Sequence, residues 1–263
     1  MFSEYELGDD LRDLSESHGC DVRVVTAERD FEILPEEGLY EIALITEEIS
    51  PTPASADWLS AESPSALTRL TKNDIAVGLP GDGGVTWTAQ TTPALIIVKP
   101  RLTGAPSDFI DFLVAEAILQ LARGHPEHLL AFFGDNYRSL ERAVNDDTDL
   151  AYRLAVSLFM GWQGLDTRPT FQTWENEYPR LGEAWSSAGD HLEDRVNALP
   201  ALMADGSLGF GAATELACSA LKHDLSLPAP FRALDVTAFR DHGARFAVTW
   251  AERTYDEVAA DDE

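Results

Sequence analysis

The sequence predicts an α+β protein, with a small and mainly antiparallel N-terminal sheet carrying two helices, followed by a C-terminal bundle of about six helices. Short runs of β-branched residues, bounded by glycine and proline, occur in the first 105 residues. From residue 106 onward the apolar residues recur mostly at helical spacing. We therefore divide the chain into a mixed region at 1–105 and a helical bundle at 106–263, which could also form one continuous domain.

The first elements follow from local patterns. Residues 4–17 predict a helix, and residues 20–26, which contain DVRVVT, predict a short strand. Residues 35–49 fit a second helix, because Pro35 stands near its first turn and its apolar residues have helical spacing. Residues 50–66 are rich in Pro, Ser and Ala, which predicts a loop.

A sheet of three or four strands is expected next. Residues 74–90 contain two short β runs around the turn Pro80-Gly-Asp-Gly-Gly84, which predicts a hairpin. The turn could also hold an anion with its amides, but it matches no phosphate-binding loop and precedes a strand. The continuous run Leu95–Val98, bounded by Pro93 and Pro100, predicts a strand that is buried on both faces.

The helical region opens with residues 107–123, which are apolar almost all round and predict a central buried helix. Gly124 should end this helix and Pro126 should open the next one. Asp146 is the expected cap of a helix with an apolar stripe at Leu150, Leu154, Leu158 and Trp162. Further helices are expected near 178–203, 211–224 and 235–257.

The charge is the strongest compositional signal. The chain has 46 acidic and 19 basic residues, for a net charge of −27, and only three of its bases are lysines. Its 44% hydrophobic and 9% aromatic content is that of a globular protein, so the acids must cover a folded surface. The acidic side chains repel one another, and this repulsion is screened at molar salt, where the Debye length is about 3 Å. This pattern favours a cytoplasmic protein from a cell with molar internal salt. The alternative is an acidic module that binds basic proteins or mimics nucleic acid.

Other classes are disfavoured. An acidic surface repels the phosphate backbone, so no nucleic-acid partner is expected. The first residues lack the basic and apolar regions of a signal peptide, and no apolar run is long enough for a membrane span. The two cysteines, Cys20 and Cys218, do not predict a disulfide framework.

One segment is basic. Residues 66–105 have a net charge of +2, from two acids and from Arg69, Lys72, Lys99 and Arg101. These four side chains could bind a small phosphate or carboxylate ligand. Alternatively, they neutralise acids of residues 1–65 or of the bundle. A charge cluster alone is a weak indication of a site, so the structural role is favoured.

A second candidate site lies on the helix near 211–224. Glu215, Cys218 and Lys222 fall near one helix face, where an acid, a thiol and an amine could perform nucleophilic or acid–base chemistry. The small residues around Cys218 also fit simple helix packing.

Three other polar residues near the central helix call for an explanation. His125 and His128 flank Glu127, but their spacing is wrong for a helical zinc motif, so we predict no metal site and no cofactor. Glu116 should be buried in the central helix and would need a partner, for which Arg153 is a candidate.

The stretches AVGLPGDGGVTWT, IIVKPRLTGAPSDFIDFLVAEA, ELACSALKHDLSLPAPF and FRDHGARFAVTWAE resemble a family of small acidic proteins of unknown function from halophilic archaea. This resemblance implies no activity, fold or site residues. Since no catalytic constellation is evident, the sequence favours a non-catalytic interaction or regulatory protein with an unidentified protein partner. The alternatives are a binder of a small anion at the basic segment and an enzyme that uses the Glu215–Cys218–Lys222 face.

Overall fold

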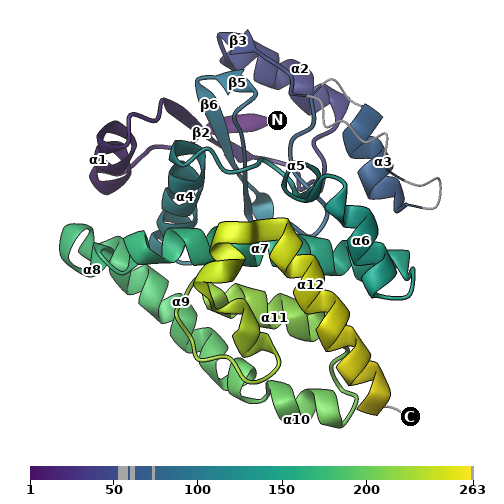
Figure 1. Ribbon diagram of the computed structural model, residues 1–263. Coiled ribbons are helices and arrows are strands. Elements are labelled where there is room, and N and C mark those ends of the chain that lie inside the picture. Colours follow the sequence, from purple (N-terminus) through teal and green to yellow (C-terminus); the bar gives the residue numbers. More distant parts are fainter. Residues whose placement is uncertain (53–58, 60–62, 73–74, 262–263) are drawn as a thin grey trace. The chain divides into compact units, whose positions relative to one another are not determined.

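The structure is a computed structural model that describes residues 1–52, 59, 63–72 and 75–261, with the side chains of residues 66, 69, 72 and 258–261 left out. It confirms the α+β class (Figure 1). Unit 1 contains Met1–Ser55, Ser65–His128 and Trp174–Ala184, and unit 2 contains Leu129–Thr173 and Trp185–Glu263. The predicted domain boundary near residue 105 stays a prediction, and in these units the helix that follows it groups with the sheet.

Unit 1 is built on a four-stranded mixed sheet with the order β1-β2-β6-β4. Its strands are β1 (Phe2–Glu4), β2 (Val22–Ala27), β4 (Val85–Thr88) and β6 (Ala94–Val98). The two outer pairings are antiparallel, as predicted, whereas the central pairing of β2 with β6 is parallel. A separate antiparallel pair joins β3 (Glu48–Ile49) to β5 (Thr91–Thr92).

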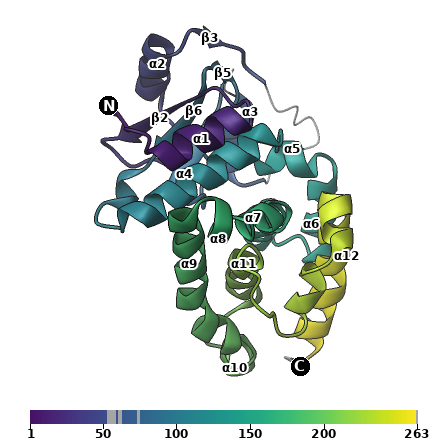
Figure 2. The ribbon, with the colours of Figure 1, turned by 90° about the vertical axis from the view of Figure 1, so that its left-hand side faces the viewer.

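The sheet is covered on both faces. Figure 2 shows α4 (Ser107–Ala122) and α1 (Asp9–Ser17) on one side of it and α2 (Glu36–Ile45) on the other. Trp87 faces α4, where its indole nitrogen donates to the Gln120 amide oxygen at 2.7 Å. The opposite face contributes Val25 and Ala27 of β2 and Leu95 and Ile97 of β6 to a core with Ile42 of α2. Because helices cover both faces of the sheet, Leu95–Val98 are all buried, as predicted.

Several N-terminal boundaries differ from the prediction. The first helix begins only at Asp9, because residues 2–4 pair with β2 instead. The second helix ends at Ile45, where the Thr46 hydroxyl donates to the Ile42 carbonyl oxygen at 2.8 Å. One helix, α3 (Ser65–Lys72), was not predicted, and most of the predicted loop at 50–66 lies outside the described residues.

The predicted hairpin around Pro80–Gly84 is wrong. Residues 75–79 form no strand, and β4 pairs with β6. The turn instead closes on itself, because the Asp82 amide donates to the Leu79 carbonyl oxygen at 3.0 Å and the Asp82 carboxylate accepts from the Leu79 amide at 3.2 Å.

The helical region contains, within the described residues, six helices of eight residues or more, as predicted. These are α4, α6 (Asn136–Ala143), α7 (Thr148–Phe171), α9 (Pro179–Asn197), α11 (Phe210–Leu221) and α12 (Thr237–Asp261). The shorter helices are α5 (Leu129–Phe133), α8 (Trp174–Glu177) and α10 (Leu199–Ala204). Helix α9 begins in unit 1 and continues in unit 2.

Two helix starts were wrong. The helix after Gly124 begins at Leu129, three residues beyond Pro126. The cap of α7 is Asp147, whose carboxylate accepts from the Leu150 amide at 3.0 Å; Asp146 has a positive φ of 60°. In the described part of the chain, no helix is both long and apolar enough to span a membrane.

Candidate functional site

The residues of the predicted face, Glu215, Cys218 and Lys222, lie on α11 and at its C-terminal cap in unit 2, and they differ in burial. Glu215 is exposed and Lys222 is half-buried, but Cys218 is only 4% exposed. A Cβ added to Gly161 of α7 would lie 2.8 Å from the Cys218 Sγ, so the glycine permits the close approach of α7 and α11. Burial, with a smaller effect of Glu215, raises the pKa of the Cys218 thiol. A thiol held in its neutral form is a poor nucleophile, and this geometry favours the packing alternative.

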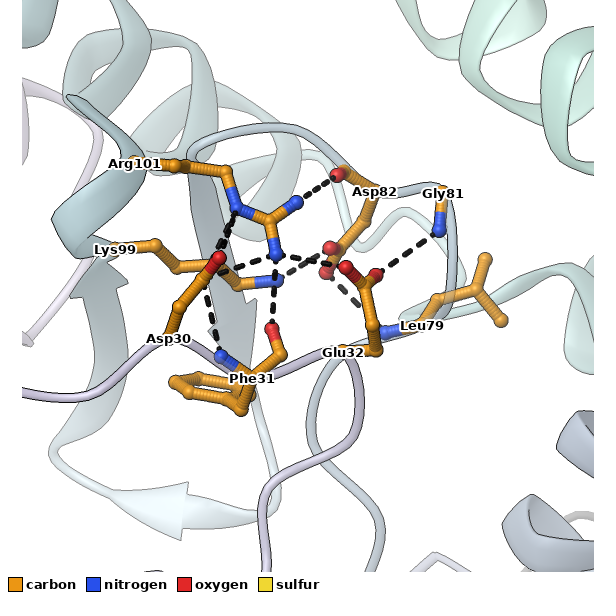
Figure 3. Close-up of polar contacts among 8 residues, drawn as sticks. All are labelled: Asp30, Phe31, Glu32, Leu79, Gly81, Asp82, Lys99 and Arg101. Carbon is orange, nitrogen blue, oxygen red and sulfur yellow. Dashed lines mark hydrogen bonds and ion pairs between the residues drawn. The ribbon is translucent and has the colours of Figure 1, made fainter.

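Figure 3 shows where two members of the basic segment lie. Lys99 directly follows β6, and its side chain is buried on the α2 side of the sheet. Its ammonium group forms an ion pair with Asp82 and lies 4.8 Å from the centroid of the Phe31 ring. Lys99 is thus neutralised by a carboxylate and an aromatic face rather than presented to a ligand.

Arg101 forms a clamp around residues 30–32 (Figure 3). Its guanidinium contacts both carboxylate oxygens of Asp30 and pairs with Glu32 at 2.8 Å. It also donates to the carbonyl oxygens of Phe31 and Asp82, each at 3.2 Å. The guanidinium group is planar and its N–H donors have fixed directions, so it suits several acceptors arranged around it in this way. Arg101 therefore holds the 30–32 segment against the turn that contains Asp82.

The turn at 79–82 completes this network, which we call the Lys99–Arg101 network: Asp30, Phe31, Glu32, Asp82, Lys99 and Arg101. The Gly81 amide donates to the Glu32 carboxylate at 3.1 Å. Gly78 has a φ of 86°, and a Cβ there would lie 2.5 Å from the Glu32 carbonyl oxygen, so a glycine is required. Burial raises the pKa of Asp82 to about 6, and Lys99 opposes part of that rise.

The other two members of the basic segment, Arg69 and Lys72, are on α3, and their side chains lie outside the described residues. The structure therefore brings together Lys99 and Arg101 and supplies both with acids. Asp30 and Glu32, which pair with Arg101, belong to residues 1–65, as the structural alternative expects, whereas Asp82, the partner of Lys99, belongs to the basic segment itself.

Glu127 is part of a second polar cluster in unit 1. Its carboxylate accepts from the Gln90 side-chain amide at 2.8 Å and from the Ala89 backbone amide at 3.2 Å. Burial raises the pKa of Glu127 to about 7, although these hydrogen bonds and one from Thr88 oppose the rise. The neighbouring His128 is buried, which lowers its pKa to about 4.

The described residues contain no group of three or more His, Cys, Asp or Glu side chains that could hold a metal ion. Glu116 is buried, as predicted, while its pairing with Arg153 remains a prediction.

A shallow cleft of about 370 Å³ also lies in unit 1. Its lining includes His18, Cys20 and Asp21 from the segment before β2, and Thr91 from β5. The Thr91 hydroxyl is already used, since it donates to the Pro93 carbonyl oxygen at 2.8 Å. Burial and the neighbouring Asp21 raise the pKa of the Cys20 thiol. Nothing in this lining provides an activated nucleophile.

The sequence did not single out the outer face of α2. Tyr40 is 75% exposed and Leu44 is 84% exposed, and they are four residues apart on one helix face. The other large hydrophobic residues exposed in the described structure, Met160 and Val236, reach only 41% and 37%. A signal was available, because residues 39–45 are mostly apolar and a helix covering one face of a sheet buries only one stripe.

Helix α2 is fixed at both ends. The Lys99–Arg101 network holds residues 30–32, and the Leu34 amide donates to the Val77 carbonyl oxygen at 2.9 Å just before the helix. After the helix, the Glu47 amide donates to the Thr92 carbonyl oxygen at 2.7 Å. The Arg23 guanidinium donates to the Ile45 carbonyl oxygen at 2.6 Å, which satisfies a terminal carbonyl of α2. The network thus serves to position the helix that exposes Tyr40 and Leu44.

Comparison with known proteins adds the family but no activity. No curated protein and no solved structure matches the chain. The predicted resemblance to a family of unknown function is confirmed, while its halophilic source stays a prediction. A family model covers residues 1–258, and the chain belongs to this family of unknown function (DUF7089).

Proposed function

We propose that this protein is a non-catalytic interaction protein that docks another protein on the outer face of α2. The observation that carries the proposal is the exposure of Tyr40 and Leu44, at 75% and 84%. Single exposed apolar residues are ordinary on protein surfaces, but two adjacent large ones on one helix face form the start of a patch.

The rest of unit 1 supports the same reading. Ile42, on the opposite side of α2, is fully buried in the sheet core, so the helix has no freedom to turn Tyr40 and Leu44 inward. The contacts at both ends of α2 hold its backbone in place before any partner arrives. A surface that is already ordered loses less conformational entropy on binding.

The two alternatives have less support. Lys99 and Arg101 are paired with acids, which removes the positive charge that an anion would need. Cys218 is buried with a raised pKa, which disfavours a nucleophilic role. We also propose that the acidic surface is an adaptation to molar salt, because Lys99, one of only three lysines, is buried rather than exposed.

Site-specific photo-crosslinking tests the docking function. A benzophenone amino acid replaces Tyr40 in the full chain, and a matched chain carries it at Val236, an exposed apolar position in unit 2. In an extract of the source cells, the probe at position 40 should give one discrete crosslinked protein that the probe at position 236 does not give. That product should disappear when Leu44→Gln is added, while the unfolding midpoint is unchanged. Equal products from both positions would contradict the proposal.

A further inference from the structure

We propose that the outer face of α2 binds an amphipathic helix whose apolar stripe is flanked by lysine and arginine. This inference rests on the proposed function, and it adds the chemistry of the partner. It depends on what surrounds Tyr40 and Leu44 and on the shape of the surface that they form.

The surroundings are acidic. Glu36 and Glu37 are exposed in the first turn of α2, and Glu47 and Glu48 are exposed just beyond its last residue. Along the chain, Tyr40 and Leu44 therefore lie between two pairs of exposed carboxylates. No pair in the described structure neutralises Glu36, Glu37 or Glu47, and Glu48 accepts only from the Ser50 hydroxyl, at 3.0 Å. A partner with positive charge at both ends of its apolar contact complements this arrangement.

The shape favours a helix as the partner. Tyr40 and Leu44 are at positions i and i+4, so they form part of a ridge on the helix surface. Such ridges pack into the grooves between the side-chain rows of another helix. The small side chain of Ala43, exposed beside the ridge, leaves room for a partner side chain.

The charge also argues against a second copy of this chain as the occupant. A symmetric contact through α2 would bring the four glutamates of each copy together, in a protein whose net charge is already −27. Like charges across an interface are unfavourable, and they favour a partner of opposite charge.

Synthetic peptides test the inference with the full chain. The probe is a helical peptide of about 18 residues with leucines along one stripe and Lys and Arg on both sides of it. One matched peptide has Gln in place of every Lys and Arg, and another has Ser in place of every Leu. Binding is measured by fluorescence anisotropy at about 0.15 M salt, where exposed charges still interact over about 8 Å, after circular dichroism has shown that the parent chain and every variant are folded at this salt concentration.

Two variants remove the parts of the site, and a third is the control. Tyr40→Gln/Leu44→Gln removes the ridge, and Glu36→Gln/Glu37→Gln/Glu47→Gln/Glu48→Gln removes the flanking charge. The control, Asp190→Asn/Glu193→Gln/Asp194→Asn/Glu252→Gln, neutralises four exposed acids of unit 2. It has the same net charge as the α2 charge variant, so it reports non-specific attraction of a basic peptide to an acidic protein.

We expect the basic amphipathic peptide to bind the parent chain, with Kd raised at least about tenfold by either α2 variant and less than about twofold by the control. An equal loss in the control would overturn the inference, because the attraction would then be general. If the Gln peptide binds as tightly as the basic one and still needs Tyr40 and Leu44, the docking function stands but the basic partner is wrong. If no peptide shows binding that depends on Tyr40 and Leu44, both fail. Self-association of the parent chain that Tyr40→Gln/Leu44→Gln abolishes would make a second copy the occupant and would also overturn the inference.

Discussion

The ammonium group of Lys99 lies 4.8 Å from the centroid of the Phe31 ring while it forms an ion pair with Asp82. Its side chain is fully buried, so its charge has exchanged water for one carboxylate and one aromatic face. Phe31 stands a few residues before α2, and its ring packs against the core beneath that helix. The buried pair therefore contributes to the position at which the chain enters α2.

Lys99→Met should lower the free energy of unfolding by about 3 kcal/mol at pH 7, because it leaves the Asp82 carboxylate buried without its partner. Urea unfolding at constant salt measures the loss. Adding Asp82→Asn should restore part of it, since the uncompensated charge is then gone. A double variant that is no more stable than Lys99→Met would contradict this account.

The same variant should be sensitive to pH. The pKa of Asp82 is already raised to about 6 by burial, and loss of Lys99 removes an interaction that lowers it. Below pH 6 the carboxyl group becomes protonated, and a neutral acid does not need the ammonium group. The stability difference between the parent chain and Lys99→Met should therefore shrink as the pH falls from 7 to 5, as unfolding curves at each pH would show. A constant difference would mean that Asp82 does not titrate in this range.

Arg101→Met should cost about 1 kcal/mol, because its partners Asp30 and Glu32 are about half exposed and are well screened by solvent. Arg101→Lys should recover little of this, since an ammonium group cannot reproduce the guanidinium fork. Arg240→Met is the control, because the one ion pair of Arg240 among the described residues is with its exposed neighbour Asp241, at 3.5 Å. Equal decreases in the free energy of unfolding for Arg101→Met and Arg240→Met would show that the contacts of Arg101 stabilise the fold no more than an exposed ion pair does.

Glu127→Gln should change how stability depends on pH. Because the folded-state pKa of Glu127 is raised to about 7 from its ordinary value of 4.5, the native state binds the proton more tightly than the unfolded state. The stability that Glu127 contributes through its bound proton is therefore fully present below about pH 4.5 and is lost as the pH rises to about 7. The parent chain should lose on the order of 3 kcal/mol relative to Glu127→Gln across this window. Parallel curves for the two proteins would contradict the raised pKa of Glu127.

Tyr40→Gln/Leu44→Gln should change the free energy of unfolding by less than about 0.5 kcal/mol, because both side chains are mostly in solvent and Gln is a good helix former. Ile42→Ala on the same helix should cost about 3 kcal/mol, because Ile42 is fully buried. Thermal and urea unfolding distinguish these cases. A large loss for the double variant would show that its side chains support the fold rather than an interaction.

Salt should stabilise the whole chain. Repulsion among acids that give a net charge of −27 is weakened as the Debye length falls from about 10 Å at 0.1 M to about 3 Å at 1 M. The unfolding midpoint should therefore rise markedly from about 0.1 M to several molar KCl. A midpoint that stays flat would contradict the proposed salt adaptation.

The parts of the fold that could be predicted are those with a local pattern. The apolar run at 95–98 and the apolar helix at 107–122 specify buried elements by themselves, and both were found. The pairing of residues 2–4 with β2 and the parallel pairing of β2 with β6 depend on residues far apart in sequence, which no local pattern shows. The hairpin prediction failed for a similar reason, because the Val77 carbonyl oxygen accepts from the Leu34 amide of a distant segment and β4 pairs with β6 instead of residues 75–79.

The candidate sites follow the same division. The sequence grouped Lys99 with Arg101 as neighbours in one basic segment, and both side chains contact Phe31, although β6 ends at Val98 and Arg101 lies in a short 3-10 helix (Pro100–Leu102). The identity of the acids that pair with Arg101, Asp30 and Glu32, depends on a loop about seventy residues away and could not be deduced. Nor does helical spacing tell which of the apolar residues 39–45 remain exposed, because that depends on which face meets the sheet.

The central parallel pair has a consequence for how the chain folds. Residues 22–26 can join residues 94–98 only after the whole intervening segment, including α2 and α3, has been closed into a loop. The entropy of this closure must be lost before the contacts of the central strands are gained. Unit 1 should therefore be slow to fold, and until β6 arrives β2 can pair only with β1, so its other edge stays open to strands of other chains.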